Sequence, residues 1–238
     1  MIGARNSEAL NEVKQSCEKL GASAIALQLD VTVESDCKSF AERAISEFKS
    51  IDILINNAGV SMRSMFSDLD ISTMQKIMET NFWGTVYCTR YALDELVKNR
   101  GSLISVGSVA GYKALPARSA YSASKFALNG FMDSIRLEYL KKNLHVGIIF
   151  PGYTRSNIRQ NALNSAGVAQ GESPLDENKL MPAEEVAEQI VDMVISRRRE
   201  KILDFEGKMV RLLNFLFPGL LDRLVYKKVS SEKDSPFH

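Results

Sequence analysis

Apolar and polar positions along the chain follow two alternating patterns. Apolar residues recur every three or four positions over residues 7–20, 32–48, 72–96, 118–140 and 182–197, and this spacing predicts helices. Ser7 and Thr32 are the expected N-caps of the first two helices. Short apolar runs at 24–31, 51–59, 102–108 and 145–152 are typical of strands buried on both faces. The sequence Gly-Ala-Arg-Asn at 3–6 is typical of the end of one more strand, and a short last strand is expected at 201–205. We expect an irregular segment at 154–180 and an apolar helical tail at 212–225.

Strands that alternate with helices predict the α/β fold class. We expect a doubly wound, Rossmann-like parallel sheet in a single domain over residues 1–238. In such sheets ligands bind beyond the carboxyl ends of the strands. Polar residues and glycines follow the predicted strand ends at Asp30, 56–59, 107–108 and 151–152. These positions are therefore the first candidates for a binding site.

The composition narrows the class of function. The 238 residues are 45% hydrophobic and 25% charged, with a formal net charge of +1, which is ordinary for a soluble globular protein and gives no general attraction to nucleic acid. The three cysteines have spacings that suit neither a zinc site nor a disulfide framework. The two histidines are His145 in an apolar run and His238 at the last position. We therefore expect no metal site, no Ser–His–Asp triad and a cytoplasmic location.

The segment from 105 to 131 carries the most informative chemistry. Ser108 follows a predicted strand end, and Tyr121 and Lys125 lie four residues apart on a predicted helix, so they share one face. A tyrosine hydroxyl titrates near pKa ~10, which is too high for efficient acid/base work at neutral pH. A nearby ammonium group favours the phenolate, so Lys125 is expected to lower the pKa of Tyr121. Ser108 can then orient the same substrate oxygen, and redox chemistry on such a site needs a nicotinamide cofactor.

Further segments accompany this set in a fixed order along the chain: Asp30-Val31, Asn56-Asn57-Ala58-Gly59, Asn81-Phe82-Trp83-Gly84 and Pro151-Gly152-Tyr153-Thr154. Together with Ser108, Tyr121 and Lys125 they resemble the short-chain dehydrogenase/reductase family of NAD(P)-binding Rossmann-fold oxidoreductases. The resemblance covers nearly the whole chain and holds for both order and spacing.

The resemblance implies a role for each matching residue. Tyr121 is expected to be the general acid/base, Ser108 to hold the substrate oxygen, and Lys125 to bind the nicotinamide ribose as well. The other implied roles are a water-mediated proton relay through the backbone of Asn81, the adenine end at Asp30 and Val31, close backbone approach to the cofactor at Asn57, Ala58 and Gly59, and the nicotinamide amide side at Pro151, Gly152 and Thr154. Two alternatives stay open, since Asn56 can simply tie neighbouring strands together and Asp30 can simply start the next helix.

Arg5 bears on the choice of cofactor. It follows what the resemblance makes the second strand of the sheet. An acidic residue there accepts from the ribose 2′-hydroxyl of NAD, whereas a basic residue suits the 2′-phosphate of NADP. Arg5 therefore favours NADP(H) over NAD(H), with a solvated surface arginine as the alternative.

The chain departs from the family pattern at its phosphate-binding turn. No TGxxxGxG-type sequence is present. The resemblance associates that turn with a first strand and first helix, so we expect an incomplete family member in which Met1 lies inside the second strand. In the family's strand order 3-2-1-4-5-6-7, this loss leaves residues 24–31 without a partner beside 51–56 and bares apolar strand edges.

The sequence thus predicts an NADP(H)-dependent carbonyl reductase or alcohol dehydrogenase that works as a homo-oligomer. Its substrate loop is expected at 154–181, and its small carbonyl or alcohol substrate can be hydrophobic. For the apolar tail at 206–228, three readings stay open: packing over the substrate pocket or core, a subunit interface, and peripheral contact with a membrane surface. The alternative function is that of a catalytically inactive family member that serves as a binding or interaction module.

Overall fold

The computed structural model describes all residues except 174, 232–234, 236 and 238. The strands are β1 (Ile2–Ala4), β2 (Ala26–Gln28), β3 (Ile53–Asn56), β4 (Ser102–Val106), β5 (His145–Phe150) and β6 (Glu200–Ile202). The α-helices are α1 (Ser7–Lys19), α2 (Glu34–Phe48), α3 (Ile71–Met78), α4 (Gly84–Lys98), α5 (Ser119–Glu138), α6 (Ala183–Ser196), α7 (Phe205–Leu216) and α8 (Pro218–Ser230). Shorter helical turns are η1 (Phe66–Asp68), η2 (Glu79–Trp83), η3 (Val109–Gly111), η4 (Leu140–Lys142) and η5 (Glu177–Lys179).

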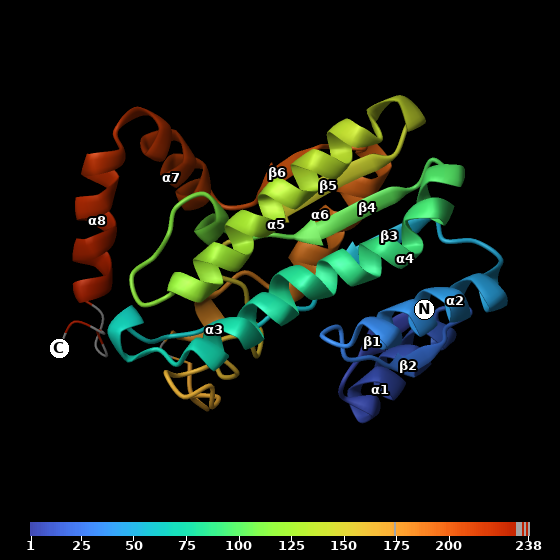
Figure 1. Cartoon of the computed structure of the whole chain (residues 1–238), viewed down its shortest axis with the longest axis horizontal. Helices are drawn as coiled ribbons and strands as arrows, with labels where there is room; N and C mark the ends of the chain where they lie inside the picture. The colour runs from blue at the N-terminus through green and yellow to red at the C-terminus, as the bar shows by residue number, and fades with distance from the viewer. Residues whose placement is uncertain (174, 232–234, 236, 238) are drawn as a thin grey trace.

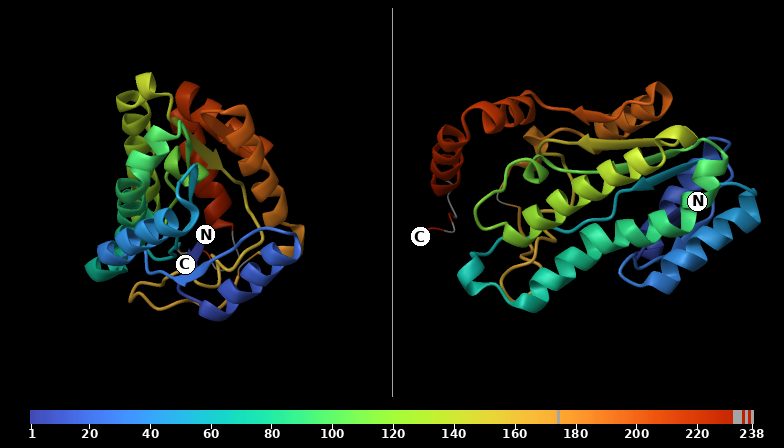
Figure 2. Two further views of the ribbon diagram at one scale, coloured as in Figure 1. Left: turned by 90° about the vertical axis from the view of Figure 1, so that its right-hand side faces the viewer. Right: turned by 45° about the horizontal axis from the view of Figure 1, so that its top comes forward.

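The strands form two parallel sheets, β1–β2 and β3–β4–β5–β6 (Figure 1). In the larger sheet, Val146, Ile148 and Phe150 of β5 pack toward α4 and α5. Ile149 packs toward α6, beside Val186 and Met193. Helices therefore cover both faces of this sheet, as Figure 2 shows. This is the α/β, Rossmann-like arrangement that the alternating pattern predicts.

The pairing of residues 24–31 differs from the expectation. These residues were expected to lack a partner, but β2 pairs in parallel with β1, with Ile2 opposite Ala26. The Leu29 amide also donates to the Ala4 carbonyl at 3.0 Å. This parallel ladder needs only three residues on each strand, Ile2–Ala4 and Ala26–Gln28, with backbone hydrogen bonds evenly spaced along it.

The outer edge of β3 lies open to solvent. Among the described residues, β3 pairs with β4 alone. Its side chains Ile53 and Ile55 are 48% and 45% exposed, respectively, which is unusual for a strand of a parallel sheet. The smaller sheet joins the larger one through packing of α2 on α4, where Leu29, Cys37 and Cys88 form a buried cluster. The expectation of an incomplete family member stays a prediction.

Two expected helix caps are wrong. Asn6, not Ser7, caps α1, because its Oδ1 accepts from the amides of Glu8 at 3.0 Å and Ala9 at 3.1 Å. Thr32 does not cap α2: its hydroxyl donates to Asp30 Oδ1 at 2.8 Å, and α2 begins after Val33 with no side-chain cap. In both places the oxygen of a preceding Asn or Asp side chain, Asn6 or Asp30, accepts from the free backbone amides of the turn.

The long helix expected over 72–96 is divided by a π-helical turn. Helix α3 ends at Met78, η2 follows as a five-residue π-turn, and α4 starts at Gly84. A Cβ at Gly84 would lie 2.7 Å from Cγ2 of Val31. Glycine therefore allows the segment after β2 to pack directly on α4. The expected apolar tail also consists of two helices, because Pro218 starts α8 at its first turn.

Candidate active site

Three of the candidate residues meet beyond the carboxyl end of β4. Ser108 follows β4 and caps η3, with its Oγ accepting from the Ala110 amide at 3.2 Å. Tyr121 and Lys125 lie on the first two turns of α5. The Nζ of buried Lys125 donates to the Val106 carbonyl at 2.9 Å and lies 5.9 Å from the centre of the Tyr121 ring. The Ser108 side chain lies near enough to Tyr121 to act on the pKa of its hydroxyl.

Burial dominates the electrostatics of this trio. It raises the pKa of Tyr121 above its ordinary value, against the opposing effects of the Ser108 side chain and the Arg118 charge. Burial also lowers the pKa of Lys125 to about 8. The direction for Tyr121 is opposite to the one expected from sequence. The spacing of Tyr121 and Lys125 indicated a charge next to the hydroxyl, but it carried no information about how far both groups are removed from water.

Asn81 lies in the π-turn η2 and is 1% exposed. Its Oδ1 accepts from the Val60 amide at 2.8 Å, and its Nδ2 donates to the Val60 carbonyl and to Ser124 Oγ, both at 2.9 Å. The side chain thus ties the segment after β3 to α5 at Ser124, the residue before Lys125. π-turns of this kind are frequent at functional sites.

The Asn56-Asn57-Ala58-Gly59 segment follows β3 and passes close to Lys125. A Cβ at Gly59 would lie 3.8 Å from Lys125 Nζ and 3.4 Å from Asn81 Oδ1. Asn57 and Ala58 are exposed. Asn56 donates from Nδ2 to Thr89 Oγ1 at 3.2 Å, so it ties β3 to helix α4 rather than to a neighbouring strand.

Arg5 and Asp30 lie together beyond the carboxyl ends of β1 and β2. Asp30 Oδ1 accepts from the Thr32 amide at 3.0 Å and from its hydroxyl, so the carboxylate stabilises the turn before α2. Burial works to raise the pKa of Asp30, but the bonds from Thr32 and the charge of Arg5 outweigh it and hold that pKa below its usual range. Val31 packs against Gly84, as described above. These residues lie on the smaller sheet, apart from the Ser108 trio.

The Pro151–Thr154 stretch leaves β5 and starts the irregular segment. A Cβ at Gly152 would lie 2.5 Å from an Asp204 carboxylate oxygen, so this glycine allows close packing against the cap of α7. Thr154 Oγ1 donates to the Gly152 carbonyl at 3.2 Å. The backbone at Thr154 also pairs with Met181 in an isolated parallel bridge.

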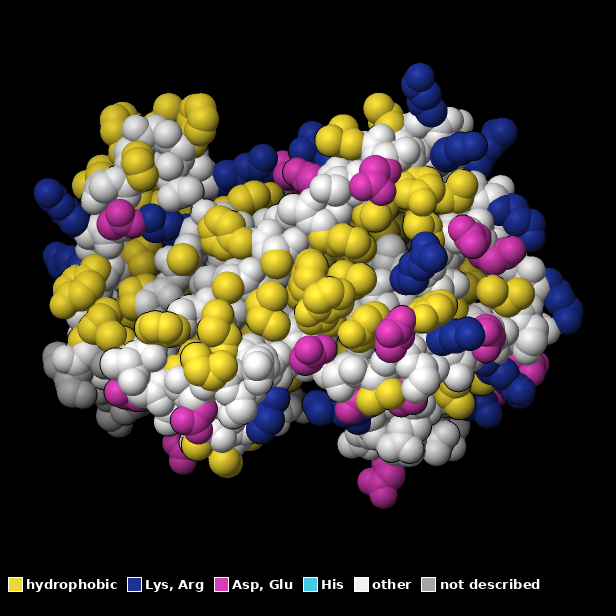
Figure 3. Space-filling model, viewed as in Figure 1, with side chains coloured by type: hydrophobic (Ala, Val, Ile, Leu, Met, Phe, Trp, Pro, Cys, Tyr) yellow, Lys and Arg dark blue, Asp and Glu magenta, His cyan; other side chains and the backbone are white. Residues whose placement is uncertain are grey.

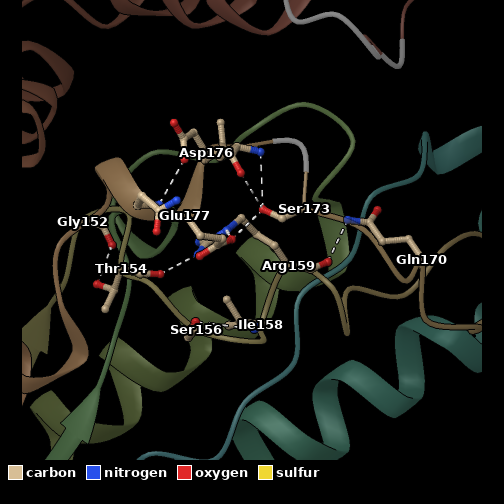
Figure 4. A network of polar contacts seen from close by, with 11 residues as sticks. Gly152, Thr154, Ser156, Ile158, Arg159, Gln170, Ser173, Asp176 and Glu177 are labelled. Carbon is tan, nitrogen blue, oxygen red and sulfur yellow. Dashed lines mark hydrogen bonds and ion pairs between the residues drawn. The ribbon is translucent and has the colours of Figure 1, made fainter.

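An ion pair that the sequence did not suggest lies at the centre of the 154–181 loop (Figure 4). The Arg159 guanidinium binds Glu177 in a bidentate manner, with Nε 2.7 Å from Oε1 and Nη2 2.6 Å from Oε2. Nη2 also donates to the Thr154 carbonyl at 2.6 Å, and Ser173 Oγ donates to Glu177 Oε1 at 2.5 Å. The Arg159 bonds above all hold the pKa of Glu177 at about 2.

The comparisons with known proteins identify the family. A family model described as short chain dehydrogenase matches residues 1–167. The chain belongs to the short chain dehydrogenase family. It is 34% identical to 11-beta-hydroxysteroid dehydrogenase A of Arachis hypogaea over 94% of this chain and 67% of that one. It is 33% identical to dehydrogenase/reductase SDR family member 7B of Mus musculus over 97% of this chain and 73% of that one.

A solved structure shares the fold of this short chain dehydrogenase. An alcohol dehydrogenase from the archaeon Thermococcus sibiricus, complexed with 5-hydroxy-NADP, superimposes with a TM-score of 0.73. The match covers 84% of this chain and 82% of the archaeal chain, at 18% sequence identity. The Rossmann-like arrangement of this oxidoreductase family is therefore present here.

Arg118 is a second site residue that the sequence reading missed. Its Nη1 donates to Ser61 Oγ at 2.8 Å and to the Met62 carbonyl at 3.1 Å, and its charge acts on the Tyr121 hydroxyl. Arg118 precedes Tyr121 by three positions at the start of α5, so helical spacing alone was a usable signal. Arg159 and Glu177 gave no such signal, because they lie 18 residues apart in an irregular loop.

Within the residues that the structure places, no group of three or more His, Cys, Asp or Glu side chains has the arrangement of a metal site. No helix in the same part of the chain is long and apolar enough to cross a membrane.

Proposed function

We propose that this short chain dehydrogenase transfers a hydride between NADP(H) and a carbonyl or alcohol, with Tyr121 as the general acid/base. The observation that supports it is the convergence of Ser108, Tyr121 and Lys125 beyond the carboxyl end of β4. In parallel α/β sheets this edge is where ligands bind. None of the three side chains can carry a hydride itself, so the reaction class follows from the cofactor.

The residues of the trio divide the work on the substrate oxygen. Tyr121 keeps its proton at neutral pH because its pKa is raised, and it can donate that proton to a carbonyl oxygen. Ser108, whose side chain acts on the pKa of Tyr121, holds the same oxygen and orients it. The Tyr121 ring packs against an apolar cluster with Met62, Val60 and Leu163, which suits an apolar carbonyl substrate.

The residues present fit the nucleoside and nicotinamide parts of the cofactor. Lys125 brings three N–H donors, one of them on the Val106 carbonyl, and Gly59 leaves its neighbourhood free of a Cβ. When bound, NADP(H) supplies or accepts the hydride. The proposed contacts to it are Lys125 with the nicotinamide ribose, the backbone of Asn57, Ala58 and Gly59, the nicotinamide amide side at Pro151, Gly152 and Thr154, and the adenine end at Asp30 and Val31. Asn81 is proposed to support proton relay, since it already holds the Val60 backbone and Ser124 beside Lys125.

Arg5 supports the preference for NADP(H) over NAD(H). It is exposed beyond the end of β1, so a 2′-phosphate can reach its guanidinium from solvent. Asp30 lies close enough to Arg5 to feel its charge. A 2′-phosphate placed there would meet one basic and one acidic group, and the basic group is the more exposed of the two.

The experiment is a reductase assay on the purified chain with NADPH and NADH, together with a panel of small and apolar aldehydes and ketones. Tyr121→Phe removes only the hydroxyl and is expected to lower kcat by about 10²–10⁴-fold, the usual contribution of a general acid. Tyr139→Phe, at the far end of the same helix, is the matched control and should leave kcat unchanged.

The outcomes separate the two functions. Reduction that needs Tyr121 and prefers NADPH supports the proposal. If Tyr121→Phe retains full activity, the proposed acid is wrong. If NADPH neither binds nor is oxidised with any substrate of the panel, the proposal is refuted for this chain, and the binding-module alternative replaces it.

A further inference from the structure

Helices α7 and α8 expose an unusual amount of apolar surface. Eight large apolar side chains of these helices and the residue between them are about half exposed or more. Their exposed fractions are 77% for Phe205, 50% for Leu212, 84% for Phe215, 51% for Leu216, 57% for Phe217, 51% for Leu220, 49% for Leu224 and 55% for Tyr226. Single exposed apolar residues are ordinary, but a contiguous group marks an interaction surface. In Figure 3 apolar side chains gather on the arm that these two helices form at the upper left. We call these eight residues the α7–α8 surface.

The inner sides of both helices are already occupied. Asn214 Nδ2 donates to the Tyr112 carbonyl at 3.1 Å, and Leu221 is 3% exposed. Asp222 pairs with Lys113, which ties α8 to the segment after η3. The arm is thus fixed to the body by its inner side. Tyr226 and Arg223 border the hollow between α8 and residues 113–116, and the other seven residues of the α7–α8 surface are exposed.

Helical spacing places the exposed apolar residues in stripes. Phe205, Leu212 and Leu216 are seven and four positions apart, so they share one face of α7. Leu220 and Leu224 are four apart on α8. An ordinary surface helix turns polar residues outward. Here each helix presents an apolar stripe outward instead.

Basic residues accompany these stripes. Arg223 and Lys227 share the face of Leu220 and Leu224, at helical spacing i, i+3, i+4 and i+7. Lys208 lies on the Phe205 side of α7, four positions before Leu212. The two acidic side chains of the arm are engaged elsewhere: Asp222 binds Lys113, and Glu206 binds Lys228. The outward face therefore combines apolar anchors with Lys208, Arg223 and Lys227, for which the described residues show no acidic partner.

We propose that the α7–α8 surface binds the surface of a membrane that contains anionic phospholipid, with both helices lying in the plane of the interface. Apolar side chains at the acyl boundary and Lys or Arg at the headgroups are the features that bind helices to such surfaces. A second copy of the chain fits less well, because it would bring a surface with the same basic residues to the contact, whereas anionic phospholipid supplies the opposite charge. The proposal does not depend on the hydride-transfer reaction.

Helix α8 lies near the segment that follows β5, on the side of the candidate active site. Lys228 Nζ lies 5.8 Å from the centre of the Tyr153 ring, in the segment that follows β5. The carboxyl edge of the larger sheet, where Ser108 and Tyr121 lie, is thus on the side of the molecule that carries α8. A bound chain would hold this edge near the lipid surface.

The test is flotation of the full chain with vesicles of phosphatidylcholine alone and of phosphatidylcholine mixed with phosphatidylserine. We expect flotation with the mixed vesicles and weaker flotation with the neutral ones, and we expect added salt to reduce it. Phe215→Ser should weaken the binding constant about tenfold or more, the usual effect of removing one inserted aromatic side chain. Arg223→Gln with Lys227→Gln should abolish the preference for the anionic vesicles.

Two substitutions of exposed apolar residues outside the α7–α8 surface serve as controls. Ile195→Ser and Leu137→Ser remove apolar side chains that are 78% and 70% exposed on other helices, and both should float like the unmodified chain. Circular dichroism checks that every variant is folded. Failure to float with either vesicle type overturns the proposal. Self-association that Phe215→Ser abolishes, without flotation, would assign the surface to a second copy instead.

Discussion

The Arg159–Glu177 pair offers a sharp test of how the 154–181 loop is held. The Arg159 side chain is 7% exposed and that of Glu177 is 25% exposed, and the guanidinium also binds the Thr154 carbonyl (Figure 4). Arg159→Met removes the charge and the hydrogen bonds but keeps the apolar stem. Glu177 then loses the group that most strongly lowers its pKa.

The size of the effect follows from the pKa of Glu177. It lies at about 2, against an ordinary value of 4.5. A shift of that size corresponds to about 3 kcal/mol of preference for the ionised form at neutral pH. Ser173 supplies part of it and Glu177 is partly solvated, so the share of Arg159 is about 2 kcal/mol. Loss of that share raises the population of the open loop about 30-fold.

Two measurements follow. The carboxyl ¹³C resonance of Glu177 should titrate near pH 2 in the unmodified chain and at a higher pH in Arg159→Met, where Ser173 still lowers the pKa. Thermolysin cleaves on the amino side of large apolar residues, so Arg159→Met and its control each gain one possible cleavage position. At the original positions, thermolysin should cut the 154–181 loop of Arg159→Met about 30-fold faster than that of the unmodified chain at neutral pH. A depressed carboxyl pKa stabilises the loop fully above pH 4.5, and the effect is lost as the pH falls toward about 2. The difference in loop stability between the unmodified chain and Arg159→Met should therefore shrink as the pH falls from 4.5 to about 2, and it should stay constant above pH 4.5.

Lys179→Met is the matched control, because its ion pair with Asp176 lies in the same loop at 82% and 52% side-chain exposure. Exposed pairs of this kind contribute little, so cleavage should stay within about twofold of the unmodified rate. The reasoning is refuted if Glu177 titrates near pH 4.5 in the unmodified chain, or if Arg159→Met and Lys179→Met are cleaved at the same rate.

Two further predictions concern packing and titration elsewhere. Gly84→Ala places a Cβ 2.7 Å from Val31, so it should cost about 1–3 kcal/mol in the free energy of unfolding, measured by urea denaturation. Gly130→Ala, where nothing lies within 4 Å, is the control and should stabilise the chain by about 0.5–1 kcal/mol. Lys125, with a pKa of about 8 when folded against 10.5 ordinarily, binds a proton more readily when unfolded. Stability relative to Lys125→Met should therefore rise by up to about 3 kcal/mol between pH 8 and 10.5, and a flat difference would contradict a buried lysine.

The order of elements could be predicted from the sequence because the apolar runs of β4 and β5 are buried on both faces. Residues 145–150 of β5 alternate between packing on α5 and on α6, so periodicity and burial carry the same information. The caps were harder to predict. Asn6 and Ser7 are both good capping residues, and which one accepts the amides depends on where the helix begins.

For the site, the sequence could predict only which residues share a face of one helix or follow the end of one strand. Tyr121 and Lys125 share a face of α5 because they lie four positions apart, and Ser108 follows a strand end. Tertiary contacts were not readable in this way. Arg159 meets Glu177 through a loop without periodic structure, and the π-turn around Asn81 breaks a helix whose apolar pattern runs on without interruption.

The pKa values of Tyr121 and Lys125 are shifted in opposite directions. Burial favours the neutral form of each group, so it raises the pKa of the tyrosine and lowers that of the lysine. A protonated Tyr121 is the form that can give a proton to a carbonyl oxygen, whereas alcohol oxidation needs the phenolate. Lys125 favours the phenolate only while it is charged, which is the case below about pH 8. With Tyr121 as the proposed acid/base, these pKa directions favour carbonyl reduction. The charge of Arg118 lowers the pKa of Tyr121 and so favours the phenolate that alcohol oxidation needs.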